Sequence, residues 1–542
     1  MSSYNNSKQQ IYLPTFVALG ISVGIMIGIF ISKYNYPVQD IQRASKKYGT
    51  ILSVIENDYV DTVDIEKLFE SSVYSMLEEL DPHTSYTPAR DLALVQSQLE
   101  GGFEGVGIEF NIMDDTLYVI TAISGGPSEK AGIRAGDKII KVDGKLIAGI
   151  GMETNDVFKL LRGEKGTKVV LTIKRNKNKE LLKFEIERDK IPTYSVDAAY
   201  MLNANTGYIK VNRFAENTYR EFFEGLTKLK KEGMNQLVLD LRDNGGGYMG
   251  VAIEMADELL KKGDLIVYTD GRLEQYRETH NAKKNGVFEN ENLIVLINEN
   301  SASASEILSG ALQDNDRALI VGRRSFGKGL VQAPIRLDDG SELRLTISRY
   351  YTPSGRSIQK SYSGEEDYAD DYLKRYENGE LFYADSIKIV DTLKYSTTHG
   401  RTVYGGGGII PDDFVAKDTS GYTDYLGKLY SQNIIRQYVL NYVNDNKDRL
   451  EKKGFEDFKA KFVVTTSMVN QVVKLADHAA ITTHKKQLKI SENKIKEDVK
   501  AFIARSIWGN SAYYEISNQT DPMILKSLQL FGKAEKIRKG EI

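Results

Sequence analysis

Residues 293–332 read LIVLINENSASASEILSGALQDNDRALIVGRRSFGKGLVQ, and this stretch decides the class of fold. An apolar strand is predicted over 293–298, and a turn of small residues follows it. The next residues, 304–313, have the spacing of a helix, and 318–321 again read as a strand. Strands that alternate with helices predict an α/β unit.

The alternation begins further upstream, with a strand over 236–241 and a helix over 249–260. Residues 38–95 have helical spacing, whereas from about residue 100 the period changes to two. The sequence also predicts a hairpin of 169–175 and 181–188 around Asn176-Lys177-Asn178, a Tyr-rich acidic insertion over 363–398 and a Lys-rich helical segment over 420–542.

Composition limits the classes of function. The 542 residues predict three or four domains, and 41% hydrophobic with 27% charged residues is a globular composition. A net charge of −3 gives no support for nucleic-acid binding. The absence of Cys excludes disulfides, thiol nucleophiles and thiolate zinc sites, and 5 scattered His make a metal centre unexpected. No metal or cofactor is therefore expected.

The segment 13–32, LPTFVALGISVGIMIGIFIS, carries no charge and follows a short tail, 1–12. Its length of about 20 residues suits a membrane span. A secretory signal is the competing interpretation, but no small-x-small cleavage site follows, so we favour an uncleaved anchor. Lys33, Arg43, Lys46 and Lys47 come after the segment, and counting positive charges alone would keep the larger part of the chain in the cytoplasm.

Ser303 is the candidate nucleophile in the turn before the helix at 304–313. Ser303 and Glu306 have the spacing of a capping box, so a purely structural capping role is the alternative. A helix N-terminus has unpaired N–H groups that would stabilise an oxyanion. Ser301 and Ser305 remain alternatives to Ser303.

Lys328 is the candidate base, because a nucleophilic serine needs one. Burial would have to lower the lysine pKa by about 3 units for the amine to be half neutral near pH 7.4. Gln332, four residues on, is expected to hydrogen-bond and orient the amine. A His-dependent triad or esterase is disfavoured, since the G-x-S-x-G run at 20–24 lies in the uncharged N-terminal segment and not in a strand-to-helix elbow, and no triad context surrounds His83, His280, His399, His478 or His484.

A phosphate loop is a second rejected alternative. Residues 322–329 read G-x-x-x-x-G-K-G, but a Walker A loop needs Ser or Thr after the Lys, and position 329 is Gly. The residues that follow, LVQAPIRL, predict a strand and not the helix that a Walker A loop requires.

Residues 104–188 resemble a PDZ domain, on the residues GVGI (105–108), GGPS (125–128) and AGIRAGDKIIKVDG (131–144). In PDZ domains a glycine loop binds a terminal carboxylate and the peptide adds a strand to the sheet edge. The resemblance implies a carboxylate loop of Gly105, Val106, Gly107 and Ile108. Ile108, Phe158 and Leu161 would then line the side-chain pocket.

The whole set of motifs resembles the C-terminal processing peptidases, also called tail-specific or carboxyl-terminal proteases, a PDZ-containing family of the Ser–Lys type. The resemblance covers about residues 40–415. Its motifs, in chain order, are DLRDNGGG (240–247), SASASEI (301–307), GKGLVQ (327–332), YTPSGRSIQ (351–359) and GGIIPD (407–412).

The resemblance implies an α+β multidomain fold, in which a PDZ domain precedes an α/β peptidase core of the ClpP/crotonase type. The expected divisions are an N-terminal helical region (38–98), the PDZ domain (100–190), the peptidase core (191–415) and a C-terminal helical domain (420–542). It also implies roles for single residues: Ser303 as nucleophile, Lys328 as base and then acid, Gln332 as the residue that positions Lys328, and an oxyanion hole of the N–H groups of Ala304 and Gly246, with Gly245 the alternative glycine.

The expected function is that of a serine endopeptidase that captures exposed protein C-termini and processes or degrades envelope proteins. Family members mostly act outside the cytoplasmic membrane, so we expect an inner-membrane anchor and a periplasmic catalytic domain, against the charge count. The C-terminal helices are expected to serve packing, an adaptor or a second copy of the chain. A catalytically silent PDZ scaffold is the alternative function, and the presence of Ser303, Lys328 and Gln332 counts against it.

Overall fold

The computed structural model describes residues 18, 21–25, 38–97, 100–113, 115–123, 125–175, 180–362 and 368–542. The chain divides into two compact units, Met1–Leu80 and Asp81–Ile542. In the smaller unit, α2 (Val38–Asp58) and α3 (Ile65–Glu78) follow one another, and the side chain of Asp64 caps α3 by accepting the Lys67 N–H at 3.0 Å. The helices predicted for this region are confirmed as far as Glu78, whereas Ser85–Thr87, also inside the predicted range, form strand β1.

Within the apolar segment 13–32, the structure describes residues 18 and 21–25, and the rest lies outside the described residues. In the part of the chain that the structure describes, none of the helices combines the length and the apolar character needed to cross a bilayer. The anchor therefore stays a prediction.

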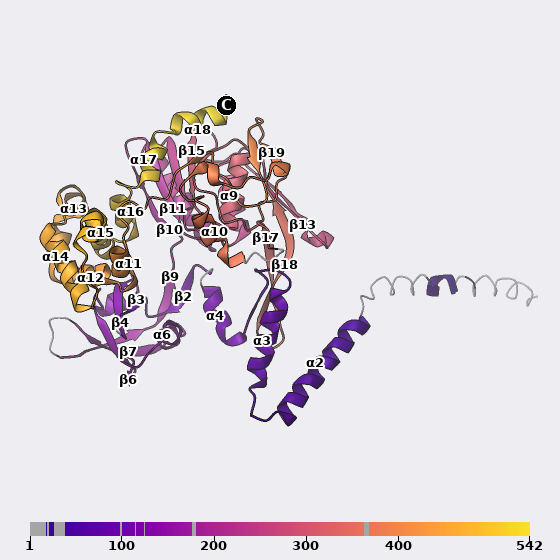
Figure 1. Ribbon diagram of the computed structural model, residues 1–542, viewed down its shortest axis with the longest axis horizontal. Coiled ribbons are helices and arrows are strands. Elements are labelled where there is room, and N and C mark those ends of the chain that lie inside the picture. Colours follow the sequence, from indigo (N-terminus) through magenta and orange to yellow (C-terminus); the bar gives the residue numbers. More distant parts are fainter. Residues whose placement is uncertain are drawn as a thin grey trace, which may run out of the picture. The chain divides into compact units, whose positions relative to one another are not determined.

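The PDZ domain in the larger unit is a sheet in the order β3-β4-β5-β7-β8, with β6 paired to β5 (Figure 1). The predicted hairpin is confirmed as β7 and β8, which pair antiparallel, although its turn lies outside the described residues. Entry and exit strands β2 and β9 also pair antiparallel, so the two connections of the domain lie side by side. The element bounds are β2 Gly102–Gly105, β3 Ile108–Met113, β4 Thr116–Ala122, α5 Pro127–Ala131, β5 Lys138–Val142, β6 Lys145–Leu146, α6 Thr154–Leu161, β7 Lys168–Lys174, β8 Leu182–Glu187 and β9 Asp189–Pro192.

The peptidase core is built on a six-stranded sheet in the order β10-β11-β12-β15-β16-β21, parallel from β11 onward. The α/β alternation predicted from the sequence is confirmed, with element ends shifted by a few residues. The bounds are β10 Val196–Met201, β11 Thr206–Val211, α7 Thr218–Lys231, β12 Gln236–Asp240, α8 Met249–Asp257, β15 Asn292–Ile297, α9 Ala304–Asp314, β16 Leu319–Gly322 and β21 Asp413–Phe414.

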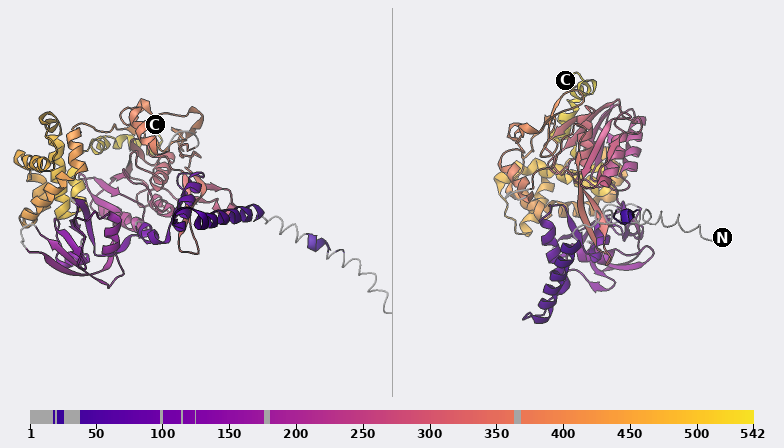
Figure 2. Two further views of the ribbon diagram at one scale, coloured as in Figure 1. Left: turned by 60° about the horizontal axis from the view of Figure 1, so that its bottom comes forward. Right: turned by 90° about the vertical axis from the view of Figure 1, so that its right-hand side faces the viewer.

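Each face of this sheet packs against a different group of helices. Side chains of α7, α8 and α9 share one core cluster with Leu237, Leu239 and Val295 of the sheet. The opposite face, including Val238 and Ile294, packs against α17 (Pro522–Leu528) and α18 (Phe531–Lys539). This alternation follows from the period of two along a strand. Figures 1 and 2 show α18 beside β15 and α9 across the sheet from it.

A second, antiparallel sheet lies over the site. Its order is β1-β18-β13-β14, with β17 also paired to β18. Strand β17 confirms that LVQAPIRL is not the helix of a phosphate loop. The strand bounds are β1 Ser85–Thr87, β13 Leu265–Gly271, β14 Thr279–Asn281, β17 Leu330–Arg336 and β18 Glu342–Tyr351. Helix α4 (Ala89–Ser97) follows β1, and η1 (Glu274–Tyr276) lies between β13 and β14. The insertion after β18 contains η2 Tyr368–Asp370, α10 Asp371–Glu377, η3 Ala384–Ser386, η4 Asp391–Leu393, β19 Lys394–Ser396 and β20 Thr402–Tyr404.

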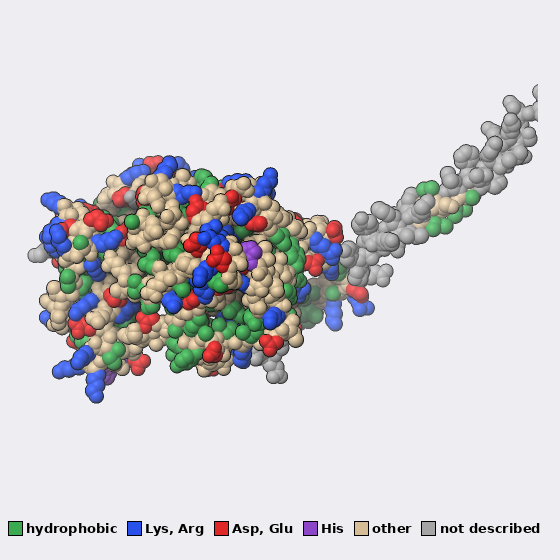
Figure 3. Space-filling view, turned by 90° about the horizontal axis from the view of Figure 1, so that it is seen from above, with side chains coloured by type: hydrophobic (Ala, Val, Ile, Leu, Met, Phe, Trp, Pro, Cys, Tyr) green, Lys and Arg blue, Asp and Glu red, His purple; other side chains and the backbone are tan. Residues whose placement is uncertain are grey.

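The predicted C-terminal helical domain, 420–542, divides between two cores. Helices α11 to α15 and part of α16 share a separate apolar cluster, whereas α17 and α18 belong to the peptidase core. The helical pattern of the sequence did not indicate which face of the sheet α17 and α18 would cover. The bounds are α11 Asp424–Ser431, α12 Ile434–Lys453, α13 Phe455–Lys461, α14 Thr466–His478, α15 Lys485–Trp508 and α16 Asn510–Ser517. Figure 3 shows basic and acidic side chains interspersed on the face that it presents.

Candidate active site

Ser303 begins α9 with an unusual backbone. Its φ of 56° and ψ of −113° lie in a region that non-glycine residues rarely occupy, at a cost of about 1–3 kcal/mol. The conformation is held because the Ser303 N–H donates to the Glu306 carboxylate at 2.8 Å and the Ser303 carbonyl accepts the Ile307 N–H at 2.9 Å. The strain therefore lies at the one serine that the sequence favours as nucleophile.

The two alternative serines are occupied elsewhere. The Ser301 hydroxyl donates to the Leu241 carbonyl at 2.9 Å, and the Ser305 hydroxyl donates to the Asn244 carbonyl at 2.8 Å. Both residues are fully buried, whereas Ser303 is partly exposed. The geometry thus favours Ser303 over Ser301 and Ser305.

Glu306 connects the serine turn to the lysine loop. Its Oε2 accepts the N–H groups of Ser303 at 2.8 Å and Lys328 at 2.9 Å. Its Oε1 accepts the Gly327 N–H at 2.7 Å and the Ser325 hydroxyl at 2.5 Å. Burial raises the pKa of Glu306 above its usual value, although these four donors oppose the shift. One buried carboxylate therefore holds the backbones of both candidate catalytic residues.

Lys328 lies in the loop between β16 and β17. The Tyr350 hydroxyl donates to the Lys328 carbonyl at 2.6 Å and lies 3.2 Å from the Ser303 carbonyl oxygen. Burial lowers the pKa of Lys328 and the nearby Arg344 lowers it further, while Asp81 and Glu306 act in the opposite direction. The net effect is a lysine that loses its proton more readily than a free one.

A direct Ser303 Oγ to Lys328 Nζ hydrogen bond is not among the hydrogen bonds of the described residues. Catalytic hydrogen bonds are often long without substrate and tighten in the Michaelis complex. The pairing of these two side chains therefore stays a prediction.

The hydrogen bond expected from Gln332 to the lysine amine is not among those of the described residues. In the described structure its amide nitrogen donates to the Thr346 hydroxyl at 3.1 Å, and Thr346 in turn donates to Asp81 Oδ1 at 3.1 Å. A register shift between Val331 and Gln332 sets Gln332 opposite Thr346 on β18. A spacing of four residues could not reveal this neighbour, because it comes from the facing strand.

The turn before β1 contributes residues that the sequence analysis did not assign to the site. Asp81 accepts the N–H groups of His83 at 2.8 Å and Thr84 at 2.9 Å, and also the Thr84 hydroxyl at 2.6 Å. The residue pattern Asp-x-x-Thr is typical of such a turn and was the available signal. Burial, and then the charge of Lys328, lower the pKa of His83 to about 4, so His83 is neutral at neutral pH.

The two candidate oxyanion donors differ in availability. The Ala304 N–H is the first of α9 and has no partner within the helix. Gly246 has a φ of 102°, and a Cβ built there would lie 2.8 Å from the Ser303 Cβ, so the loop reaches the nucleophile. However, the Gly246 N–H already donates to Asn244 Oδ1 at 2.9 Å. The Gly246 assignment thus requires Asn244 to release this N–H, and the choice between Gly245 and Gly246 stays open.

The PDZ residues predicted to bind a peptide lie at an open sheet edge. Within the described sheet, β3 pairs only with β4, so its other edge has no partner strand. Gly107 has a φ of 75°, which suits glycine, and it lies with Gly105 and Val106 in the segment that leads into β3 at Ile108. The Val106 and Ile108 side chains are buried in the domain core, and the Phe158 ring on α6 packs edge-on against Phe110 at 5.3 Å.

Fold and site together define a class: a serine-type peptidase with a serine at a helix N-terminus, a half-buried lysine whose loop is bound by the same carboxylate, and a PDZ domain ahead of the core. Comparison with known proteins agrees. The model of peptidase family S41 matches residues 205–368, a PDZ domain model matches 118–175, and a family of unknown function, DUF8443, matches 425–509.

The carboxy-terminal-processing protease of Bartonella bacilliformis is 39% identical over 325 residues, which cover 59% of this chain and 74% of the relative. A "Probable CtpA-like serine protease" of Staphylococcus haemolyticus is 35% identical over 63% of this chain and 68% of the relative. The chain belongs to the carboxy-terminal-processing serine peptidases of family S41.

Two solved structures are also similar in sequence to parts of the chain. The photosystem II D1 C-terminal processing protease is 32% identical, with a TM-score of 0.33 over 57% of this chain and 88% of that one. The PDZ domain of a carboxy-terminal protease from Vibrio cholerae, solved in complex with a peptide, is 31% identical, with a TM-score of 0.16 over 17% of this chain and 99% of that domain.

Proposed function

We propose that the protein is an endopeptidase that binds protein C-terminal tails through its PDZ domain and cleaves them with Ser303 and Lys328. The observation that carries the proposal is the shared carboxylate oxygen of Glu306, which accepts the N–H groups of both residues. The burial that lowers the Lys328 pKa supports the role of a base.

Acylation begins when the neutral Lys328 amine accepts the Ser303 hydroxyl proton as Oγ attacks the substrate carbonyl carbon. The carbonyl electron pair moves to oxygen, and the Ala304 N–H at the start of α9 stabilises that oxyanion. When the C–N bond breaks, the Lys328 ammonium returns its proton to the leaving amine.

Hydrolysis repeats the same proton transfers with water. Lys328 accepts a water proton as the water oxygen attacks the acyl carbon, and it then gives the proton back to Ser303 Oγ. Gln332 acts through the Thr346–Asp81 hydrogen bonds, and Asp81 is one of the charges that influence the lysine.

Tail binding would add a strand to the free edge of β3, with the terminal carboxylate at the loop of Gly105 to Ile108. The open edge and the positive φ of Gly107 support this assignment. Phe158 faces the same side of the sheet as Phe110 and would contact tail side chains.

The test compares the full-length protein with Ser303→Ala on an unfolded protein that has an apolar C-terminus. Peptides are identified by mass spectrometry, and binding of the tail to both proteins is measured in parallel. Cleavage by the wild type alone, with binding by both, is the expected result. Tail binding without cleavage by either protein would instead favour the silent PDZ scaffold.

We further propose that residues 13–32 anchor the protein in the inner membrane, with the catalytic domain in the periplasm acting on envelope proteins. The uncharged stretch supports the anchor, and the periplasmic location is supported by family members, which mostly act outside the cytoplasmic membrane. The cluster of Lys and Arg after the segment favours the opposite orientation. Alkaline phosphatase fused after residue 542 should be active in cells. An inactive fusion with normal expression would place the domain in the cytoplasm.

We also propose that helices α11 to α15 provide a surface for an adaptor or a second copy. Their own apolar cluster makes them a separate packing unit, which supports the role. Analytical ultracentrifugation of the full chain tests self-association, and a monomer at all concentrations would leave only the adaptor.

A further inference from the structure

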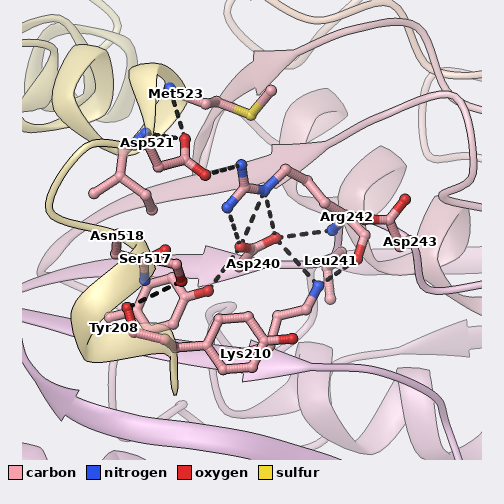
Figure 4. Close-up of polar contacts among 12 residues, drawn as sticks. Tyr208, Lys210, Asp240, Leu241, Arg242, Asp243, Ser517, Asn518, Asp521 and Met523 are labelled. Carbon is pink, nitrogen blue, oxygen red and sulfur yellow. Dashed lines mark hydrogen bonds and ion pairs between the residues drawn. The ribbon is translucent and has the colours of Figure 1, made fainter. Parts of the chain in front are cut away.

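A buried charge cluster lies at the carboxyl end of β11 and β12 (Figure 4). The Asp240 carboxylate, 1% exposed, accepts the Tyr208 hydroxyl at 2.8 Å and Arg242 Nη2 at 2.6 Å. Lys210 Nζ lies 3.4 Å from the same carboxylate and also donates to the Arg242 carbonyl. Two cations therefore surround one buried anion.

Asp521 supplies the second negative charge. Its Oδ2 lies 2.7 Å from Arg242 Nη1, and the two side chains are only 23% and 15% exposed. With Asp521 the cluster has two positive and two negative groups, whereas without it Lys210 and Arg242 share a single carboxylate. Removing one partner of a buried ion pair is strongly unfavourable, because it leaves an uncompensated buried charge.

Arg242 begins the glycine loop that reaches Ser303. The Asn244 carbonyl in this loop accepts the Ala302 N–H at 3.0 Å and the Ser305 hydroxyl at 2.8 Å, so it is bonded to residues on both sides of Ser303. Gly246 lies against the Ser303 Cβ itself. A displacement of Arg242 is thus transmitted to the backbone that holds the nucleophile and the oxyanion donors.

Asp521 is itself held firmly in place. Its Oδ1 caps α17 by accepting the N–H groups of Met523 at 2.8 Å and Ile524 at 3.1 Å, and both of those side chains are buried on the peptidase sheet. Asp521 lies outside the residues that the family models match, 205–368 and 425–509. The N-cap residue of α17 therefore contributes a contact that the matched family residues do not contain.

We propose that Asp521 is a positioning residue for catalysis, which fixes the glycine loop of residues 242–247 through its ion pair with Arg242. The inference rests on the proposed peptidase function. It assigns α17, far from Ser303 in sequence, a part in the geometry of the oxyanion hole.

Asp521→Asn in the full-length protein tests this, because Asn keeps an oxygen that caps α17 but removes the charge. We expect kcat to fall by about tenfold to a hundredfold with KM nearly unchanged. Binding of a peptide boronic acid, which forms a tetrahedral adduct with the serine, should weaken by a similar factor. Tail binding to the PDZ domain should stay at the wild-type level. Asp521→Glu, which restores the charge, should recover part of kcat.

Thr465→Ala is the matched control, since the Thr465 side chain caps α14 by accepting the Met468 N–H at a distance from the cluster. It should lower the Tm while kcat stays at the wild-type value. The proposal is overturned if Asp521→Asn keeps wild-type kcat and boronate affinity, or if its kcat falls only as far as its folded fraction does. A wild-type protein that does not cleave would refute the peptidase function itself, and with it this inference.

Discussion

At the scale of single residues, Glu306 makes more hydrogen bonds than its capping-box spacing predicts. The sequence predicted its bond to the Ser303 N–H, which is confirmed at 2.8 Å. Its bonds to Gly327 and Lys328 could not be predicted, because they depend on how a loop twenty residues away folds back. Gln332 shows the same limit, since its partner Thr346 is set by strand register.

Glu306→Gln should weaken both the fold and catalysis. Glutamine has one acceptor oxygen, and its NH₂ group would face N–H donors, so at least one buried donor loses its partner. We expect the free energy of unfolding to fall by about 1–3 kcal/mol and kcat to fall at least tenfold. Chemical denaturation and peptide hydrolysis measure the two effects.

Glu221→Gln is the control for that variant, because Glu221 also accepts two backbone N–H groups, those of Ser195 and Val196, at 2.8 and 3.0 Å. It should cost stability but leave kcat unchanged. Equal losses of kcat in both variants would mean that Glu306 acts through general stability alone.

The lowered pKa of Lys328 predicts how the reaction rate depends on pH. Its pKa is lowered from 10.5 by burial, and the neutral amine is the reactive form. kcat/KM should therefore rise with pH and level off below pH 10.5, and Lys328→Met should lose about 100-fold to 10,000-fold in rate with tail binding retained. A flat profile from pH 5 to 9, or a rate in Lys328→Met near that of the wild type, would contradict a lysine base.

Among the elements, the strands and helices around the site follow directly from hydrophobic period. The sequence placed the helix of Ser303 at 304–313, and α9 runs from Ala304 to Asp314. The antiparallel sheet above the site was harder to predict, because β1 and β18 are separated by more than two hundred residues and only tertiary pairing joins them.

The loop into β3 gives a prediction for tail recognition. A Cβ at Gly107 would lie 2.8 Å from Ile191 Cδ1, and the φ of 75° disfavours any other residue. Gly107→Ala should therefore weaken binding of a labelled tail peptide by about tenfold or more, as measured by fluorescence polarisation.

Gly144→Ala provides the comparison, because Gly144 has a φ of 79° with open space around a Cβ. It carries the backbone cost of about 1–2 kcal/mol without the clash, and lies in the turn between β5 and β6. Equal weakening in both variants would show that domain stability, and not the loop, controls binding.

Across the whole molecule, the peptidase sheet depends on the end of the chain. Val238, Ile294 and other sheet residues are buried by α17 and α18, whereas Met1–Leu80 forms a unit of its own. The sequence predicted helices for the last hundred residues but not this role, because helix period does not say what a helix packs against.

Two truncations test whether the peptidase core needs α17 and α18 and can fold without Met1–Leu80. Residues 81–542 should fold with a Tm within a few degrees of the full chain, while residues 1–518 should unfold or aggregate because the apolar sheet face is exposed. Circular dichroism and size-exclusion chromatography separate the outcomes. A well-folded 1–518 chain would show that α17 and α18 are dispensable for the core.

The pairing of β2 with β9 has a consequence for engineering. Because Gly102 lies opposite Pro192, the PDZ domain leaves the chain almost where it enters. A recognition domain with adjacent termini could therefore be grafted between Gly105 and Asp189 without respacing the catalytic centre. Such a chimera would lose the ion pair that joins Glu109 of β3 to Arg505 at 3.0 Å. Its activity would thus show whether peptide cleavage and substrate recognition are independent, or whether cleavage requires contact between the PDZ domain and the C-terminal helices.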